Sequence, residues 1–263
     1  MSVGPDGESD LELLLIEIGV LWGRDARGRY EEPPRAVIAV CENGMAVVSA
    51  PDVPDPLSDR LHAIVEDPPG TGRPGVRPPA ADLCRTVLAS ADGPLEMAGG
   101  PSYYAEPPLS LGTDLTLLVS TNPADVGRLS DARPDSWEPD EWRELLAGRL
   151  GPWAMLADDE CVVTICHSPR ESATGVEAGV WTEPQYRGQG HAAAATAAWA
   201  NLMTSGRRRH LFYSTSQDNR SSQRVAERLG LHEIGWLWKV AAPGCYGAHS
   251  IDLEIRSDDP QGT

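Results

Sequence analysis

The residues with the clearest chemical pattern are Gln-Tyr-Arg-Gly-Gln-Gly, at positions 185–190. The run before them, Val176–Thr182, is rich in β-branched and aromatic residues and predicts a strand, whereas the alanine-rich run after them, His191–Met203, predicts a helix. A glycine turn at the start of a helix leaves backbone N–H groups without partners, and the helix dipole places about half a positive charge there. The pattern therefore predicts a binding site for a phosphate-like anion.

The spacing of the glycines separates this turn from two other phosphate-binding motifs. The dinucleotide fingerprint requires a third glycine three residues after the second, where this chain has Ala193. The mononucleotide P-loop requires a lysine after glycine, and the only lysine of the chain is Lys239. Two interpretations remain: a pyrophosphate site of another family, or a turn that uses glycine only for its positive φ angle.

A second pattern follows further along the chain. His210–Ser216 predicts a strand, and the helical stretch after it is closed by Gly230, a frequent residue beyond a helix C-terminus. Asp218 or Asn219 is suited to cap the start of this helix, because a short polar side chain can accept a hydrogen bond from the first turn. Leu231–Val240 predicts a last strand. Its alternation would place three apolar residues on one face, Ile234, Trp236 and Trp238.

Together the two patterns resemble the GNAT acetyltransferase superfamily over roughly residues 120–245. The resemblance rests on Gln-x-x-Gly-x-Gly at 185–190 after a strand that ends in Thr-Glu-Pro, on Asn219 at the start of the next helix and on Gly230-Leu231 at its end. It implies an α/β (α+β) fold in which helices flank a mixed, V-shaped sheet, here with an N-terminal α/β extension. It also implies an acetyl-CoA-dependent N-acetyltransferase that acts on the amine of a small molecule and uses no metal.

The same resemblance indicates which residues hold the cofactor. Backbone N–H groups from Arg187 to Ala192 would bind the pyrophosphate of coenzyme A, and the end of the preceding strand would pair with the pantetheine arm. The cofactor-binding residues indicated in this way are Val180, Trp181, Thr182, Gln185, Arg187, Gly188, Gln189, Gly190, His191, Ala192, Asn219 and Ser222.

Acyl transfer to an amine also requires a base for the ammonium and a proton donor for the leaving thiolate. Glu177 lies on the strand before the turn, where related enzymes often place a glutamate that acts through water; an exposed strand glutamate is the alternative interpretation. His167 on the preceding strand is a second candidate base, or a histidine outside the reaction. Many members carry a tyrosine where this chain has Ala226. Ser222 is then the candidate donor, unless the thiolate, with a pKa near 8.5, leaves without one.

Composition narrows the class of ligand. The chain of 263 residues has a formal net charge of −17, which argues against nucleic acid because phosphate backbones are bound through basic patches. Arginine is nevertheless frequent near the glycine turn, at Arg187, Arg220, Arg224 and Arg207–Arg209, which fits a small polyphosphate. Five scattered cysteines predict neither a disulfide framework nor a zinc site. With no run of about 18 apolar residues and no basic N-terminal signal, we expect a cytoplasmic protein without a membrane partner.

We divide the chain into an N-terminal α/β region of unknown role at 1–120, a linker at 121–130, the acetyltransferase-like domain at 131–250 and a tail at 251–263. Within 1–120 an irregular stretch is expected at Pro68–Pro79. The other elements expected there are strands at Leu13–Trp22, Ala36–Ser49 and Leu115–Ser120 and helices at Leu57–Asp67 and Ala80–Ala91. The domain is expected to begin with a helix at Glu138–Leu150 and a hairpin of Trp153–Leu156 with Glu160–His167.

Three rival functions are compatible with the sequence. An acyl-CoA-binding sensor would bind coenzyme A without turnover. An acyl-CoA decarboxylase or hydrolase on the same scaffold would consume its substrate without an amine. A protein N-acetyltransferase would need a groove for a peptide, which the N-terminal region could form or close. A homodimer is compatible with the sequence as well.

Overall fold

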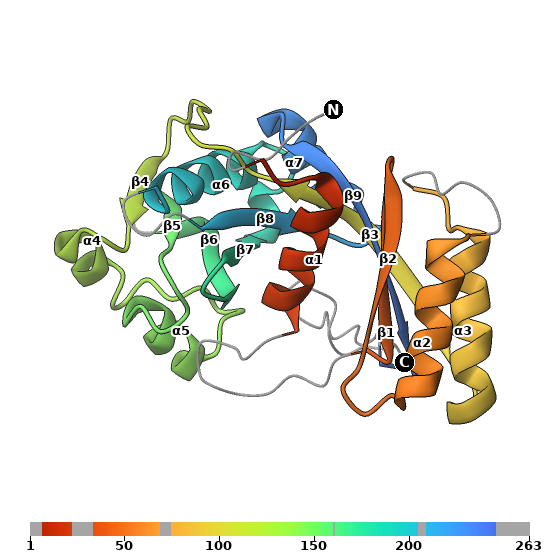
Figure 1. Cartoon of the computed structure of the whole chain (residues 1–263). Helices are drawn as coiled ribbons and strands as arrows, with labels where there is room; N and C mark the ends of the chain where they lie inside the picture. The colour runs from red at the N-terminus through yellow and green to blue at the C-terminus, as the bar shows by residue number, and fades with distance from the viewer. Residues whose placement is uncertain (1–6, 23–33, 69–74, 160, 205–208, 246–263) are drawn as a thin grey trace, which may run out of the picture.

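The computed structural model describes residues 7–22, 34–68, 75–159, 161–204 and 209–245. In these residues nine strands form one sheet, in the order β2-β1-β9-β3-β8-β7-β6-β5-β4 (Figure 1). The strands are β1 (Ala36–Cys41), β2 (Gly44–Ser49), β3 (Glu96–Tyr104), β4 (Thr116–Val119), β5 (Ala154–Asp158), β6 (Cys161–Glu171), β7 (Gly175–Thr182), β8 (His210–Ser214) and β9 (His232–Ala241). The helices are α1 (Asp10–Leu21), α2 (Asp55–Glu66), α3 (Pro79–Asp92), α4 (Pro123–Arg128), α5 (Pro139–Leu146), α6 (His191–Leu202), α7 (Arg220–Leu229) and the short 3-10 helix η1 (Pro184–Tyr186).

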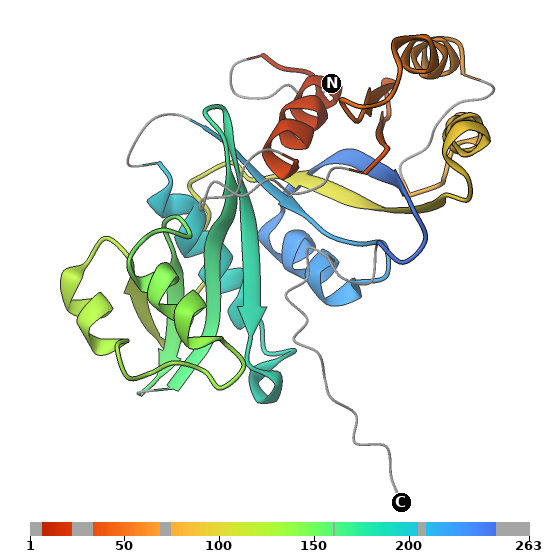
Figure 2. The ribbon, with the colours of Figure 1, turned by 90° about the horizontal axis from the view of Figure 1, so that it is seen from below.

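The sheet opens between β7 and β8. These two strands are parallel, whereas the other neighbouring strands are antiparallel. Their pairing is short, beginning with Gly175 opposite His210 and ending with Glu177 opposite Phe212. Figure 2 shows β6 and β7 (green) turning away from β3 (yellow) and β9 (blue), with α7 beside the opening. The predicted mixed, V-shaped sheet flanked by helices is therefore confirmed.

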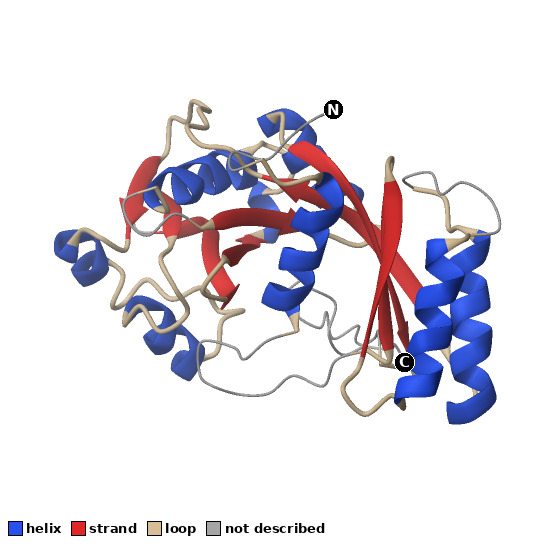
Figure 3. Ribbon diagram, in the orientation of Figure 1, coloured by secondary structure: helices blue, strands red, loops and turns tan. Residues whose placement is uncertain are grey.

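Helices cover both faces of this opening (Figure 3). α6 and α7 pack on one face, here called the α6 face, in a cluster that contains Val176 and Tyr213. α1 packs on the opposite face, the α1 face, with Phe212, and α5 covers the same face beside Trp181. Because successive side chains of a strand point to opposite faces, Glu177 belongs to the α1 face. A separate cluster packs α2 and α3 on β1 and β2.

The first element differs from the prediction: Leu13–Trp22 is not a strand but part of helix α1. Its start is a capping box, in which Ser9 Oγ accepts a hydrogen bond from the Glu12 N–H and the Glu12 carboxylate accepts one from the Ser9 N–H. An apolar run of this length has no clear period, so it fits a buried strand or a buried helix equally well. The capping box favours the helix over the strand, because it satisfies backbone N–H groups that are left without partners only at the start of a helix.

Most other predicted elements are confirmed. The expected strands at Ala36–Ser49 are the hairpin of β1 and β2, and both N-terminal helices are present as α2 and α3. The predicted helix at Glu138–Leu150 ends earlier, at Leu146, since Gly148 adopts a φ of 73° that a helix cannot continue. Trp142, Leu145 and Leu150 are buried and Leu146 is partly buried, as helical spacing predicts for the core-facing side. The indole of Trp142 donates a hydrogen bond to the Leu129 carbonyl at 3.1 Å.

The alternation predicted for the last strand is wrong at one position. Ile234 packs in the cluster under α1, whereas Trp236 and Trp238 pack on the opposite face beside α2 and α3. The register between β3 and β9 shifts here, because Ser102 pairs with Gly235 but the next residue, Tyr103, pairs with Glu233. The extra residue is a β-bulge, which turns the side chains before it to the other face.

The N-terminal strands are part of the same sheet as the acetyltransferase-like region. β3 lies between β8 and β9, and β1 pairs with the other edge of β9. At the opposite end, β4 lies before residue 120 but pairs with β5, and α4 occupies the expected linker at 121–130. The tail at 251–263, Arg207, Arg208 and positions 69–74 of the expected irregular stretch lie outside the described residues. None of the helices in the described ranges is long and apolar enough to cross a membrane.

Candidate functional site

A cavity of about 440 Å³ lies at the opening of the sheet. Its walls are the end of β7, the glycine turn, the first turn of α6, Tyr213 of β8 and one side of α7. Seen from the sheet, it lies on the α6 face, because α6 and α7 pack there. The two sequence patterns, which are separate along the chain, thus form one site.

The glycine turn has the geometry that an anion-binding helix terminus requires. Gly188 and Gly190 have φ angles of 78° and 91°, in the left-handed region that favours glycine. Gly190 is the N-cap of α6, and no side chain caps this helix. Backbone N–H groups of the first turn are therefore left for a ligand, at the positive end of the helix dipole.

Arginine side chains surround this terminus. Arg187, Arg224 and Arg228 line the cavity, and Arg187 also donates a hydrogen bond to the Thr182 carbonyl at 3.2 Å. Arg228 lies against the turn: a Cβ atom at Gly190 would lie 2.0 Å from its Nη1. A chain with a net charge of −17 thus gathers positive charge at one helix N-terminus. This combination suits a polyphosphate group.

The sequence did not indicate Arg228, although it lies one helical turn after Arg224 and so on the same side of α7. Two other arginines that the sequence suggested for the ligand form interactions with protein side chains instead. Arg220 bonds Gln223, and Arg209 forms an ion pair with Glu171 at 2.8 Å.

Most of the residues predicted to bind the cofactor lie in the cavity wall. Those that do are Val180, Trp181, Thr182, Arg187, Gly188, Gly190, His191, Ala192, Asn219 and Ser222. Gln185 and Gln189 are not among the lining residues; the Gln189 side-chain amide donates instead to the Gln185 carbonyl at 3.4 Å. Beyond Glu177 no described strand pairs with the β8 side of β7, so its backbone is available to an extended ligand arm.

The start of α7 is organised by Asn219, which is the N-cap of the helix as predicted. Its Oδ1 accepts a hydrogen bond from the Ser222 N–H at 2.9 Å, and Gly230 closes the helix with a φ of 64°. The cap places the Ser222 hydroxyl beside β8, where it lies 2.6 Å from the hydroxyl of Tyr213. Both side chains line the cavity.

Tyr213 is a site residue that sequence reasoning missed. The position where many related enzymes carry a tyrosine is Ala226 here, fully buried in the same cluster as Tyr213. The buried ring of Tyr213 on β8 belongs to this cluster, and its hydroxyl reaches Ser222 of α7. A phenol hydroxyl is therefore present at this wall of the cavity, supplied by a strand instead of a helix.

Glu177, the predicted base, lies on the α1 face and is fully buried. Its Oε1 accepts two hydrogen bonds from Ser214, from the N–H at 2.8 Å and from the hydroxyl at 2.7 Å. Its Oε2 has no hydrogen-bond partner among the described residues. Burial raises the pKa of the Glu177 carboxyl to about 7, although the bonds from Ser214 oppose the shift. Such a carboxyl can exchange a proton near neutral pH.

His167, the second candidate base, lies on the same face but in an apolar setting. It stands opposite Gly179 on β7, is 2% exposed, and its ring centroid lies 5.7 Å from that of Trp137. Burial lowers the pKa of His167 to about 4, and the nearby Leu150 backbone opposes this only in part. The imidazole is therefore neutral at neutral pH and a much weaker base than Glu177.

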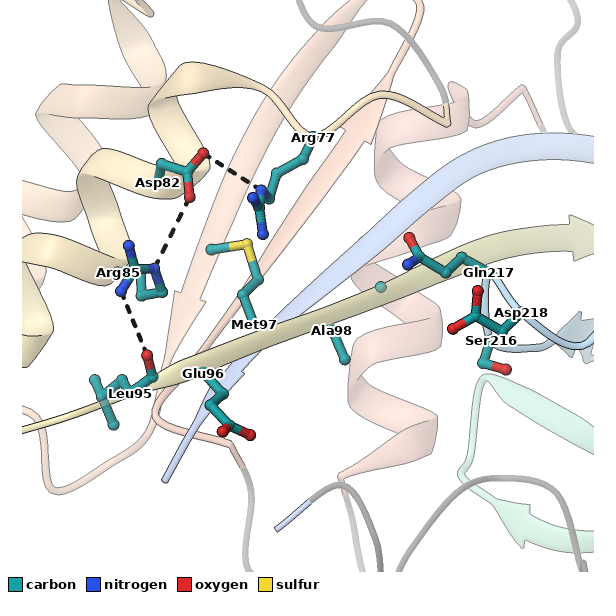
Figure 4. A pocket seen from close by; sticks show the side chains of 11 residues that line it. Arg77, Asp82, Arg85, Leu95, Glu96, Met97, Ala98, Ser216, Gln217 and Asp218 are labelled. Atoms are coloured by element: carbon teal, nitrogen blue, oxygen red, sulfur yellow. Dashed lines mark hydrogen bonds and ion pairs between the residues drawn. The ribbon is translucent and has the colours of Figure 1, made fainter. Parts of the chain in front are cut away.

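A second cavity, of about 520 Å³, lies between α3, β3 and the loop before α7 (Figure 4). Arg77 and Arg85 point to Asp82 in it, at 3.3 and 3.8 Å. These charges already have partners, and none of the predicted site residues lies there. The described residues also contain no group of three His, Cys, Asp or Glu side chains that could hold a metal ion.

Comparisons with known proteins point to the same region. A family model described as an acetyltransferase (GNAT) domain matches residues 112–232. No curated protein sequence gives a significant match to the chain.

Solved structures with a similar chain include an acetyltransferase of the GNAT family from Novosphingobium aromaticivorans, with 20% sequence identity, a TM-score of 0.40 and coverage of 55% of this chain and 64% of that one. A GCN5-related N-acetyltransferase from Kribbella flavida has 18% identity, a TM-score of 0.44 and coverage of 61% and 64%. This chain thus spans just under two thirds of the length of both. A GCN5-related N-acetyltransferase-like protein from Streptococcus suis has 13% identity, a TM-score of 0.41 and coverage of 79% and 84%.

Proposed function

Because a family model of a GNAT acetyltransferase domain matches residues 112–232, we propose that the chain is an acyltransferase that moves the acetyl group of acetyl-CoA to the amine of a small molecule by direct transfer. The observation that carries the proposal is the pairing of two features across one opening in the sheet. An arginine-lined helix terminus lies on the α6 face, and a buried carboxyl whose pKa is about 7 lies on the α1 face.

Different parts of the cavity wall suit the pyrophosphate and the pantetheine arm of coenzyme A. The N–H groups of the first turn of α6, with Arg187 and Arg228 beside them, would hold the pyrophosphate. The unpaired edge of β7 from Ala178 to Thr182 would bond the amides of the pantetheine arm, as a neighbouring strand would. The arm then leads the thioester towards Glu177, where β7 and β8 part.

In the proposed reaction, the acceptor amine approaches from the α1 face. Glu177, through a water molecule, takes a proton from the ammonium, and the amine nitrogen attacks the thioester carbonyl carbon. A C–N bond forms, the C–S bond breaks, and its electron pair leaves on sulfur. Glu177 is a better base for this step than His167, because a base with a pKa of about 4 holds a proton weakly at neutral pH.

The leaving thiolate would be protonated from the α6 face. Tyr213 and Ser222 share a hydrogen bond in the cavity wall, so the phenol can give its proton to sulfur and recover one through the serine hydroxyl. This assigns Ser222 a relay role beside Tyr213. A thiol of pKa near 8.5 is a good leaving group, so the contribution of this pair is modest compared with that of the base.

The proposal is tested first by measuring acetyl-CoA binding and then by measuring acetyl transfer to different acceptors. Acetyl-CoA at about a hundred times its dissociation constant should stabilise the protein by roughly 2.7 kcal/mol and raise the unfolding midpoint by a few degrees. Thiol release is then measured with a panel of small amines, a set of peptides, and no acceptor. Release that depends on a small amine supports the proposal. Binding without release indicates a sensor, release without an acceptor indicates a hydrolase or decarboxylase, and release with peptides alone indicates a protein acetyltransferase.

A further inference from the structure

The buried side of helix α1 carries one ionisable side chain among apolar ones. Leu13, Leu14, Ile18 and Leu21 follow helical spacing and are buried against the sheet. Glu17 lies in the same stripe, one turn after Leu13, and is fully buried too. A carboxyl at such a position costs free energy unless it is paired or protonated. The packing of the helix therefore does not explain it.

The Glu17 carboxyl lies where β7 and β8 part. Ser102 of β3 and Ser214 of β8 lie beside it, and Glu177 of β7 is close enough that its charge raises the pKa of Glu17. Ser214 also donates two hydrogen bonds to Oε1 of Glu177, so one serine neighbours both carboxyls. The N-terminal region thus places an acid next to the predicted base of the C-terminal region.

Polar atoms at this place lack partners. Both carboxyl oxygens of Glu17, Oε2 of Glu177 and Oγ of Ser102 are buried without a partner at hydrogen-bond distance among the described residues, although the hydroxyls of Ser102 and Ser214 lie close enough to Glu17 to lower its pKa. Among the described residues, the one cation whose charge acts on the pair is Arg170, and its effect on Glu177 is the smallest of those that shift this pKa. Burial penalises the charged form of both carboxyls and the influence of Arg170 is small, so the pair keeps one proton.

The proton belongs to Glu17 when the base is charged. Burial, and then the charge of Glu177, raise the pKa of Glu17 well above its ordinary value, whereas Glu177 ionises near pH 7. A neutral carboxyl has one O–H to donate, and Oε2 of Glu177 is, with Oγ of Ser102, one of the nearby acceptors without a partner among the described residues. A hydrogen bond to a carboxylate stabilises its charged form, in a place where burial alone favours the neutral one.

We propose that Glu17 is a positioning residue for acyl transfer, whose protonated carboxyl supports the ionised Glu177 and orients its free oxygen at the opening of the sheet. This rests on the proposed function. The proton of the acceptor ammonium passes to Glu177, and Glu17 keeps its own throughout. The N-terminal region is then part of the active site on the α1 face, opposite the cofactor cavity.

The test compares Glu17→Leu with Glu17→Gln in the full-length chain. Leucine removes the buried polar group, so we expect the unfolding midpoint to rise. It also leaves Glu177 unsupported, so kcat/KM at pH 7 should fall about tenfold for each unit by which its pKa rises, and the acid limb of the pH profile should move to higher pH. Glutamine keeps a neutral donor and should keep both rate and profile. Glu12→Leu makes the same change at an exposed position of the helix; it should lower the midpoint and leave the rate unchanged.

A wild-type rate and profile in Glu17→Leu would overturn the proposal, and so would equal losses in the leucine and glutamine variants. Acetyl-CoA should still raise the midpoint of both, because the cavity lies on the other face. If the wild-type chain transfers no acetyl group, the proposed function fails but the carboxyl pair can still be tested. The infrared carbonyl band of a protonated carboxyl at pH 8 should be present in the wild type and lost in Glu17→Gln; a band that persists places the proton elsewhere and refutes the role of Glu17.

Discussion

At the scale of single residues, the base and the acid of the proposed reaction lie on opposite faces of one sheet. Glu177 lies beneath α1, and Tyr213 with Ser222 lies beside α7. A base with a pKa of about 7 placed next to its own proton donor would exchange protons with it directly. Separation by the sheet avoids this, because the two groups meet only through the substrates at the opening between β7 and β8.

Replacing Glu177 tests the base. We expect Glu177→Gln to lower kcat/KM by roughly 10²–10⁴-fold, since glutamine cannot accept the ammonium proton. In the wild type the base works only when ionised, so the rate should rise with pH through about 7 and then level off. The variant should lose this rise. Rates measured from pH 5.5 to 9 check both points, with Glu183→Gln at the end of β7 as the control; a retained limb would move the titration to another group.

Replacing Tyr213 tests the proton donor. Tyr213→Phe keeps the ring that packs in the cluster but removes the hydroxyl that lies 2.6 Å from Ser222. We expect kcat for thiol release to fall about tenfold at pH 7 and less at pH 9, where a thiolate with a pKa near 8.5 is stable in water. Tyr103→Phe is the matched control, because this ring neighbours Tyr213 at 6.5 Å between centroids but does not line the cavity. Similar rates for the two variants would remove Tyr213 from the mechanism.

At the scale of elements, the cavity proposed to bind the cofactor depends on the start of helix α6 and on one side of helix α7. The turn before α6 supplies uncapped N–H groups, and α7 supplies Arg224 and Arg228. Local sequence predicts both helices well: alanine in α6, the Asn219 cap and the Gly230 stop of α7 act over a few residues. Which side of α7 faces the turn is not a local property, and this is why Arg228 was missed.

Replacing Gly190 tests this junction. A Cβ atom there would lie 2.0 Å from Nη1 of Arg228, so Gly190→Ala should push the guanidinium away from the turn. We expect acetyl-CoA affinity, measured by calorimetry, to fall roughly tenfold to a hundredfold, as for the loss of a charge-assisted contact. Gly188→Ala carries a similar positive φ but has nothing within 4 Å of the added Cβ, and so measures the backbone strain alone. Equal affinities for the two variants would contradict the role of Arg228.

At the scale of the whole molecule, the region that the family model matches does not form a complete sheet without the N-terminal region. Residues 112–232 end at the start of β9 and lack β3, which pairs with β8, and α1, which covers Phe212. Removing these elements leaves β8 with an unpaired edge and an apolar face in water. Each buried Leu or Phe contributes about 1.5–3 kcal/mol, so the loss of several side chains approaches the total stability of a typical domain.

A truncation measures this dependence. We expect a fragment of residues 112–232 to show no cooperative unfolding transition and no thermal shift with acetyl-CoA. A fragment of residues 7–245, which keeps the described elements, should unfold at nearly the midpoint of the full chain. Thermal unfolding followed by circular dichroism distinguishes the outcomes. A short fragment with a cooperative transition and a normal cofactor response would show that the N-terminal elements only extend the sheet.

The sequence by itself determined what depends on near neighbours. The glycine turn, the caps of α7 and the β-branched and aromatic residues of β7 each act over a few positions, so a candidate anion site and the order of the elements around it could be predicted. Helix α1, which was predicted as a strand, had its signal in the Ser9 and Glu12 capping box, which is local and could have been recognised.

Only the tertiary structure decided what depends on distant parts of the chain. The insertion of β3 between β8 and β9 and the meeting of Glu17 with Glu177 join segments far apart in sequence. Burial and charge are properties of such neighbours: an isolated glutamate in an apolar helical stripe has an ordinary pKa until a second carboxyl and a dry interface surround it. The sequence therefore determined the side of the site proposed to bind the cofactor, while packing between the two halves decided the side proposed to receive the acceptor.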